Sequence, residues 1–492
     1  MDLDVHGRCE KTKVSLKSSA VSGIKWSTFS QVGRQIVGLA TTIILARLLE
    51  PSDFGLVGMA TVVTGFIALF KDLGTSAAII QRKELTESLL SSVFWVNVGF
   101  GAVAMIVLYF LAPSFAYIYR ETRIELLLQV LSINFFISGL SITQQALMVK
   151  SMAFNKLAKL EITTTLAGSL VGIGAAFLGF GVWSLVYQAL ARTSIMSILL
   201  WVFNNWRPGL TFHLHEVLSI RKFSLNLAGY NTFNYFVRNA DYFLIGRYLG
   251  AQDLGFYTLA YQIMLYPLRN ISTVIGRVMF PLFSQIQENH PRFRNAYLLI
   301  TGAIALVTFP MMFGLWALAK PFVMAVFGPQ WQPVILLLVI LVPVGMFQSI
   351  ITTVGAIYQA KGRTDILFRW GIGSGLLAIL AFVIGLQWGI VGVASAYAIF
   401  SMVLAYPAFA IPFRFIELPM GDFIEAIWRP LACSTMMLGI LLAGKSLAPT
   451  NLSNTVLLSF MVPAGVLVYG IATRLINWER AREVFMVLWG KA

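Results

Sequence analysis

The amino-acid sequence predicts an all-α polytopic membrane protein with about 14 transmembrane helices. Of its 492 residues, 58% are hydrophobic and only 12% are charged, and the mean hydropathy is +0.78. A soluble protein of this length carries far more charge. Apolar runs of about 20 residues, the length of a membrane-spanning helix, recur along the whole chain. A faint internal repeat predicts in addition that the helices form two similar lobes.

The repeat relates two segments that lie 200 residues apart and align without a gap. The offset corresponds to six predicted helices, and because six is even, both copies cross the membrane in the same direction. The sequence therefore predicts two parallel six-helix repeats, which form two lobes around a central cavity, plus two extra C-terminal helices. The matching patterns are Arg47-x-Leu49-x3-Asp53-x-Gly55-x4-Ala60 and Arg247-x-Leu249-x3-Asp253-x-Gly255-x4-Ala260.

The first half of the chain is predicted to form the N-lobe, over residues 24–204. Residues 1–23 precede it as a polar, cytoplasmic leader that lacks the apolar core of a signal peptide. A cytoplasmic linker over residues 205–223 follows it. The six N-lobe helices are predicted at 24–46, 54–70, 89–112, 124–148, 157–178 and 182–203.

The second half is predicted to form the C-lobe, over residues 224–413. Residues 414–475 add helices 13 and 14, which have no partner in the repeat. Residues 476–492 form a cytoplasmic amphipathic tail that is expected to lie on the membrane surface. The helices of this half are predicted at 224–246, 254–276, 294–318, 332–358, 366–386, 389–412, 427–444 and 455–474.

The charge distribution predicts the orientation of the chain in the membrane and argues against one class of partner. The chain has 36 Lys and Arg residues against 21 Asp and Glu residues, which gives a net charge of +15. The positive residues lie mainly in the leader and in alternate loops, which predicts cytoplasmic N- and C-termini. Because this charge is spread over short loops, no nucleic-acid partner is expected.

The sequence also predicts that the protein is not an enzyme and has no cofactor or metal. The loops are too short to hold a soluble catalytic domain, and there is no P-loop for ATP. Cys9 and Cys433 form no ligand pattern. His213 and His215 have no cysteine or acidic cluster around them, so a metal site is not expected there.

Polar residues follow one face of three predicted helices. In the helix 224–246 the steps between them are 3, 4 and 3 residues, which is helical spacing. An arginine that faced lipid would cost about 2.5 kcal/mol or more, so these faces are expected to line a cavity between the lobes. The stripes contain Asn231, Asn234, Arg238 and Asp241 in helix 7, Gln31 and Arg34 in helix 1, and Gln262 and Arg269 in helix 8.

These residue types favour an anionic or sugar-bearing substrate. A guanidinium donates two parallel hydrogen bonds to a phosphate, so Arg34, Arg238 and Arg269 are the candidate phosphate ligands. The amides, which are those of Gln31, Asn231, Asn234 and Gln262, are candidates for binding sugar hydroxyls.

Two further residues, Asp241 and Glu161, are candidates for ion coupling. A structural alternative stays open for the charged groups, namely that they only join helices. Arg238 and Asp241 lie three residues apart and could neutralise each other. Glu161 could be an interfacial residue, and Arg192, a fourth arginine within the spans, could be purely structural.

Several short motifs resemble those of bacterial polysaccharide flippases. Each motif is common by itself, but their order along residues 20–415 is more specific. They are Ile44-Leu45-Ala46-Arg47-Leu48-Leu49-Glu50-Pro51-Ser52-Asp53-Phe54-Gly55, Asp72-Leu73-Gly74 followed by residues 77–83, Gly181-Val182-Trp183-Ser184-Leu185-Val186, Phe280-Pro281-Leu282-Phe283-Ser284, and Phe327-Gly328-Pro329-Gln330-Trp331.

The family concerned is the polysaccharide-exporter branch of the multidrug/oligosaccharidyl-lipid/polysaccharide superfamily, which includes lipopolysaccharide, capsule and colanic-acid flippases. The resemblance implies a multi-pass protein of the bacterial inner membrane. Its implied substrate is an undecaprenyl-pyrophosphate-linked oligosaccharide, moved by alternating access for surface polysaccharide synthesis. Membrane lipid, a polysaccharide polymerase and export machinery are the implied partners.

In this superfamily, cationic residues of helices 1, 2, 7 and 8 line the cavity. Arg34, Arg238 and Arg269 match that pattern by helix, whereas helix 2 of this chain contains no arginine. The extra helices 13 and 14 also depart from the many members that stop at twelve.

Three other functions stay open. A drug/cation antiporter would share the fold, but such pumps favour acidic or aromatic chambers. A membrane polysaccharide polymerase or glycosyltransferase would need a sizeable outer loop, and the outer loops predicted here are short. A scaffold protein without transport would not need charged residues inside its helices.

Overall fold

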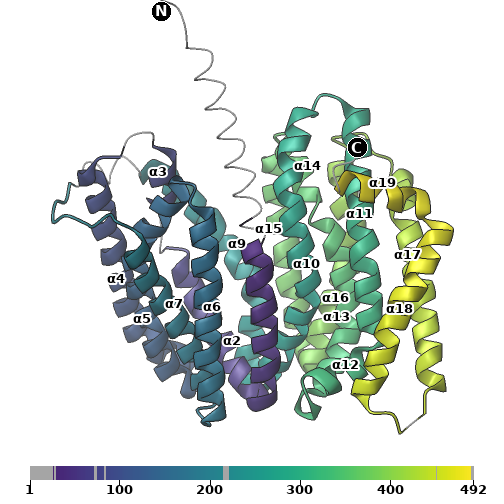
Figure 1. Cartoon of the computed structure of the whole chain (residues 1–492), viewed down its shortest axis with the longest axis horizontal. Helices are drawn as coiled ribbons and strands as arrows, with labels where there is room; N and C mark the ends of the chain where they lie inside the picture. The colour runs from purple at the N-terminus through teal and green to yellow at the C-terminus, as the bar shows by residue number, and fades with distance from the viewer. Residues whose placement is uncertain are drawn as a thin grey trace, which may run out of the picture. The chain divides into compact units, whose positions relative to one another are not determined.

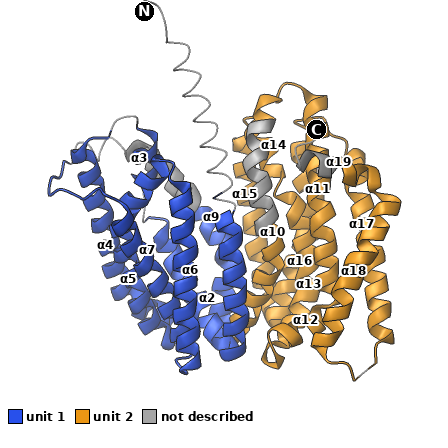
Figure 2. Cartoon of the chain, in the orientation of Figure 1, with its two compact units in different colours: residues 1–251 blue, residues 252–492 orange. Residues whose placement is uncertain are grey.

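A computed structural model of the chain describes residue 26 and residues 29–70, 75–82, 85–213, 221–449 and 451–488. The chain divides into two compact units, Met1–Ala251 and Gln252–Ala492 (Figure 2). Helices make up both units (Figure 1). Within the described residues, ten ranges are long and apolar enough to cross a membrane. The predicted all-α polytopic fold class is thereby confirmed.

In unit 1, the first helix covers residues 29–48 of the part of the chain that the structure describes. The unit ends with α9, which belongs to the predicted C-lobe but packs here against α2 and α4. The predicted lobe boundaries and the repeat axis stay predictions. The other helices of this unit are α2 (Pro51–Ala68), α3 (Thr75–Gln81), α4 (Glu87–Tyr119), α5 (Arg123–Lys150), α6 (Phe154–Phe177), α7 (Trp183–Phe203) and α9 (Arg221–Tyr248).

Helices α4 and α5 form a hairpin with a tight crossing. A Cβ atom added to Gly101 would lie 2.6 Å from the Phe135 carbonyl oxygen, and one added to Gly139 would lie 2.6 Å from the Asn97 carbonyl oxygen. Small residues let membrane helices approach this closely. The buried Asn97 side chain joins three helices, since it accepts a hydrogen bond from Thr75 at 2.9 Å and donates to Thr143 at 3.4 Å.

One residue of the repeated pattern makes a close contact in unit 1. A Cβ atom on Gly55, in the second turn of α2, would lie only 1.7 Å from the carbonyl oxygen of Ala251. Glycine is therefore the residue that fits here, for reasons of space. The capping box of α2, in which Glu50 and Asp53 pair through side chain and backbone, fixes the start of this helix.

Unit 2 packs around aromatic side chains. Phe283 stacks on Phe293 with ring centroids 4.4 Å apart, and Phe409 lies 4.7 Å from Phe423. Tyr297, fully buried, shares a hydrogen bond of 2.9 Å with Thr353. The helices are α10 (Ala251–Gln285), α11 (His290–Ala317), α12 (Ala319–Val326), η1 (Pro329–Trp331), α13 (Pro333–Ile351), α14 (Val354–Ala360), α15 (Thr364–Gly385), η2 (Leu386–Trp388), α16 (Gly389–Phe413), α17 (Met420–Leu447), α18 (Asn454–Ile476) and α19 (Trp478–Leu488).

The ten apolar ranges are fewer than the 14 predicted helices for two reasons. The range Thr364–Phe413 contains two helices, α15 and α16. The helix over residues 29–48, α9 and α10 are long enough, but they are not among the ten ranges. These are the three helices with polar stripes, and those side chains lower the mean hydropathy.

Candidate functional site

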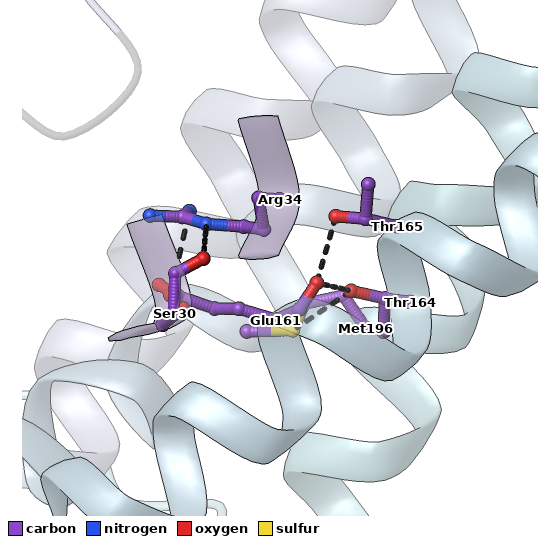
Figure 3. Close-up of polar contacts among 6 residues, drawn as sticks. All are labelled: Ser30, Arg34, Glu161, Thr164, Thr165 and Met196. Atoms are coloured by element: carbon purple, nitrogen blue, oxygen red, sulfur yellow. Dashed lines mark hydrogen bonds and ion pairs between the residues drawn. The ribbon is translucent and has the colours of Figure 1, made fainter. Parts of the chain in front are cut away.

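A polar cluster joins the first helix of unit 1 to α6 (Figure 3). The Arg34 guanidinium lies 3.4 Å from Oε2 of Glu161, and the Ser30 hydroxyl donates a hydrogen bond of 2.6 Å to the same oxygen. Nε of Arg34 also donates to the Ser30 carbonyl at 3.4 Å. One carboxylate oxygen of Glu161 therefore forms an ion pair with Arg34 and accepts a hydrogen bond from Ser30.

Local packing holds the Glu161 backbone in place. Its carbonyl oxygen accepts hydrogen bonds from Thr165 at 2.7 Å and from Thr164 at 3.1 Å (Figure 3). Ile162, the next residue, packs against the first helix, since a Cβ on Gly33 would lie 3.3 Å from its Cδ1 atom. These contacts fix the carboxylate beside the arginine-bearing face of the first helix.

The Arg34–Glu161 pair is only partly buried. The Arg34 side chain is 32% exposed and the Glu161 side chain 22% exposed. Neither side chain is therefore fully enclosed by the helix packing. The same pair would be weak in bulk water, but screening by solvent is reduced in a membrane protein.

A second arginine contributes to the field of this cluster. Arg192 of α7 is accessible and interacts electrostatically with both Arg34 and Glu161. Glycines of α6 bring α7 close, because a Cβ on Gly168 would lie 2.9 Å from the Arg192 Cβ. Two arginines and one carboxylate thus contribute to the local field, and the surplus positive charge favours a bound anion.

Arg192 was not among the predicted substrate-binding residues. The sequence signal was an arginine in an apolar span, Trp183–Phe203, that contains no acidic residue to neutralise it. Gln31, in contrast, is a predicted site residue that lies half-buried on the first helix, three positions before Arg34.

The stripe of α9 is described from Asn234 onward. Asn234 is half-buried, Arg238 is exposed, and Asp241 is only 3% exposed. Oδ1 of Asp241 accepts a hydrogen bond of 2.9 Å from the Tyr242 backbone N–H. The ion pairs within the described residues do not include Arg238 with Asp241, although the two are three residues apart.

The position of α9 in unit 1 is set by Tyr235. Its hydroxyl donates to backbone carbonyls of α2, at 3.1 Å to Thr61 and 2.9 Å to Val62. Phe66 of α2 packs on Phe236 with ring centroids 4.9 Å apart. These contacts place the α9 stripe at a defined rotation relative to α2.

The remaining predicted residues are placed only in part. Gln262 is exposed on α10 of unit 2. The side chains of Asn231 and Arg269 lie outside the described residues. Of the predicted site, the structure therefore brings Arg34 and Glu161 into contact. The gathering of Arg34, Arg238 and Arg269 in one chamber stays a prediction.

Unit 1 also contains a cavity of about 290 Å³ where α2, α5 and α7 meet. Most of its wall is apolar, but Thr61, Thr64, Asn134 and Ser138 contribute polar groups. Oδ1 of Asn134 is buried without a hydrogen-bond partner. The cavity can therefore accept a hydrogen bond from a hydroxyl or amide group.

Comparison with known proteins gives a consistent set of relatives. The family model "Polysaccharide biosynthesis protein" matches residues 44–336. The teichuronic acid biosynthesis protein TuaB of Bacillus subtilis (strain 168) is 32% identical, over 92% of this chain and 95% of that protein. The lipopolysaccharide biosynthesis protein WzxC of Escherichia coli (strain K12) is 30% identical, over 88% and 90%. The succinoglycan biosynthesis transport protein ExoT of Rhizobium meliloti (strain 1021) is 31% identical, over 71% of each.

Solved structures show the same fold at lower identity. The lipid II flippase MurJ in its inward closed conformation aligns with a TM-score of 0.73 at 15% identity, over 93% of this chain and 99% of that one. An inward-facing multidrug resistance transporter of the MATE family aligns with a TM-score of 0.64 at 18% identity, over 78% and 94%. At these identities the likeness establishes the fold alone.

Proposed function

This chain belongs to the polysaccharide biosynthesis protein family, and we propose on that premise that it is a flippase. Its substrate would be an undecaprenyl-pyrophosphate-linked oligosaccharide repeat unit, moved across the bacterial inner membrane for surface polysaccharide synthesis. The names of the relatives WzxC, TuaB and ExoT support this assignment. The observation that carries it here is the accessible Arg34, which lies on a membrane helix beside a second arginine.

The arrangement suits a pyrophosphate. In the resting state Arg34 holds the Glu161 carboxylate, and a pyrophosphate would compete for the same guanidinium with more charge and a bidentate geometry. Arg192 adds attraction without a carboxylate of its own on α7. Amides such as Gln31 and Asn234 would hydrogen-bond the sugars, and the polyprenyl tail would stay in lipid. Alternating access of the two lobes would complete transport.

The drug antiporter alternative is less well supported. It shares the fold, as the MATE alignment shows. A cationic drug, however, would be repelled by the surplus positive charge around Arg34. The same charge distribution suits an anion in the cytoplasmic leaflet. Inner-membrane location with cytoplasmic termini, and cooperation with a polymerase and export machinery, are part of the proposal.

Lipid analysis of a deletion strain tests the proposed function. Leaflet-selective labelling of polyprenyl-linked sugars is expected to show complete repeat units accumulating on the cytoplasmic side, with loss of surface polymer. Restoring the intact gene should reverse both effects. Unchanged lipid-linked pools combined with altered sensitivity to drugs or dyes would instead establish the antiporter.

Ion coupling is proposed at Asp241, the buried acid of the α9 stripe. If its carboxylate carries a proton or cation, Asp241→Asn should uncouple transport from the ion gradient. We expect export to fall about tenfold or more, and its response to an ionophore to disappear. Surface polymer is measured with and without the ionophore. If the Asp241→Asn protein exports polymer normally and this export still responds to the ionophore, Asp241 is not the coupling residue.

A further inference from the structure

Unit 2 contains a cavity of about 260 Å³ where α11, α17 and α19 meet. It lies at the N-terminal ends of α11 and α17 and at the junction between α18 and α19. Its volume is close to the lower limit for small-ligand sites, so it suits a headgroup rather than a whole lipid. None of its residues belongs to the polar cluster around Arg34.

A buried amide in this cavity has an unsatisfied acceptor. Asn477 is only 2% exposed and lines the cavity, and its Oδ1 atom has no hydrogen-bond partner. Its backbone is fixed, because its N–H donates to the Thr473 carbonyl at 2.9 Å and its own carbonyl accepts from Ala481 at 3.0 Å. A buried acceptor without a partner is costly, so a ligand with an N–H or O–H donor would be favoured here.

Two side chains of opposite charge, Arg480 and Glu483, line the same cavity. Arg480 donates one hydrogen bond of 3.0 Å to the Glu425 carbonyl, which leaves further N–H groups of its guanidinium for a ligand. Glu483 lies about one helical turn further along α19. The two residues are not among the ion pairs of the described chain, so each is able to bind a ligand group.

Part of the cavity wall is apolar. Leu298 and Leu306 of α11 both line it, and a rise of 1.5 Å per residue separates them by about 12 Å along the helix. Gly302 lies between them and leaves space, since a Cβ there would meet only the Ala426 carbonyl oxygen, at 3.4 Å. A cavity lined by both charged and apolar side chains suits an amphiphile.

We propose that this cavity binds the headgroup of a phospholipid that carries a primary ammonium, such as phosphatidylethanolamine. The ammonium would donate to Asn477 Oδ1 and to the Glu483 carboxylate, and the phosphate would accept from Arg480. The glycerol end would continue along α11 toward Leu306. A choline headgroup has no N–H group, so it leaves Asn477 unsatisfied. The site is therefore selective for the ammonium.

Native mass spectrometry of the full-length protein in detergent tests this site. We expect phosphatidylethanolamine to bind about tenfold or more tightly than phosphatidylcholine, as for hydrogen bonds to a charged group. Asn477→Leu should abolish that preference, and Asn477→Asp, which keeps the acceptor, should retain it. Arg480→Gln should weaken binding of both lipids. Arg482→Gln, an exposed arginine of α19 outside the cavity, is the matched control and should change nothing.

Each other result overturns the proposal. Equal binding of both lipids, or equal losses in Arg480→Gln and Arg482→Gln, would show unspecific lipid adhesion. An undiminished preference in Asn477→Leu would exclude the amide as the ligand group. Displacement of the lipid by soluble phosphoethanolamine at matched concentration would show that the ligand is a free molecule. Because binding is measured directly, these results do not depend on the flippase assignment.

Discussion

Arg34→Ala is expected to abolish export of surface polysaccharide while the protein still reaches the membrane. Arg34 lies on the first helix, is partly exposed, and holds a carboxylate in this structure. Loss of charge-assisted hydrogen bonds to a pyrophosphate should reduce transport about tenfold or more. The measurement is surface polymer per unit of membrane-inserted protein. Arg123→Gln, which changes an exposed arginine paired with Glu121, is the control and should export normally.

The double variant Arg34→Ala/Glu161→Gln separates substrate binding from helix packing. In Arg34→Ala alone, Glu161 loses its ion-pair partner at 3.4 Å and keeps the Ser30 hydroxyl. Neutralising Glu161 in the double variant removes the carboxylate charge that Arg34 balanced. If Arg34 binds substrate, export stays absent in the double variant. Recovered export would show that Arg34 only neutralises Glu161, and the binding role would be wrong.

Gly55→Ala is expected to lower the melting temperature of the purified protein. The added Cβ would lie 1.7 Å from the Ala251 carbonyl oxygen, a backbone atom that no rotamer change moves away. Overpacking of this kind costs about 1–3 kcal/mol, which corresponds to a Tm lower by about 2–12 °C.

Gly99→Ala on α4 is the matched control for Gly55→Ala. No atom lies within 4 Å of its added Cβ, so only the helix propensity changes, in the stabilising direction. Tm is measured by fluorescence-monitored size-exclusion chromatography after heating. Equal Tm values for the two alanine variants would refute the close contact at Gly55.

The sequence predicted the helices well because apolar length is a local property. The predicted helix 389–412 corresponds to α16 (Gly389–Phe413), for example. Other helix ends were predicted wrongly, because hydropathy does not show where the backbone leaves the helical conformation. The predicted helix 89–112 continues through Pro113 to Tyr119, and the predicted helix 332–358 is interrupted after Ile351. The short helix Thr75–Gln81 was missed because it is far shorter than a span.

The candidate site was less predictable because its contacts join distant parts of the chain. The sequence identified Arg34 as a candidate phosphate ligand, but not its contact with Glu161 of α6. Helical spacing placed Arg238 and Asp241 on one face, yet one is exposed and the other buried, since α9 packs against α2 through Tyr235. Periodicity gives the face of a helix, whereas tertiary packing decides the partner.

The low hydropathy of the polar-striped helices affects how the protein is made. An arginine at the centre of a helix opposes insertion by about 2.5–3.5 kcal/mol on translocon scales. The helix over residues 29–48 emerges from the ribosome long before α6, which supplies the Glu161 carboxylate for Arg34. Likewise, α9 reaches a bilayer that already contains α2, whose Thr61 and Val62 carbonyls accept its Tyr235 hydroxyl. The polar groups of these helices thus make their integration depend on the order of synthesis.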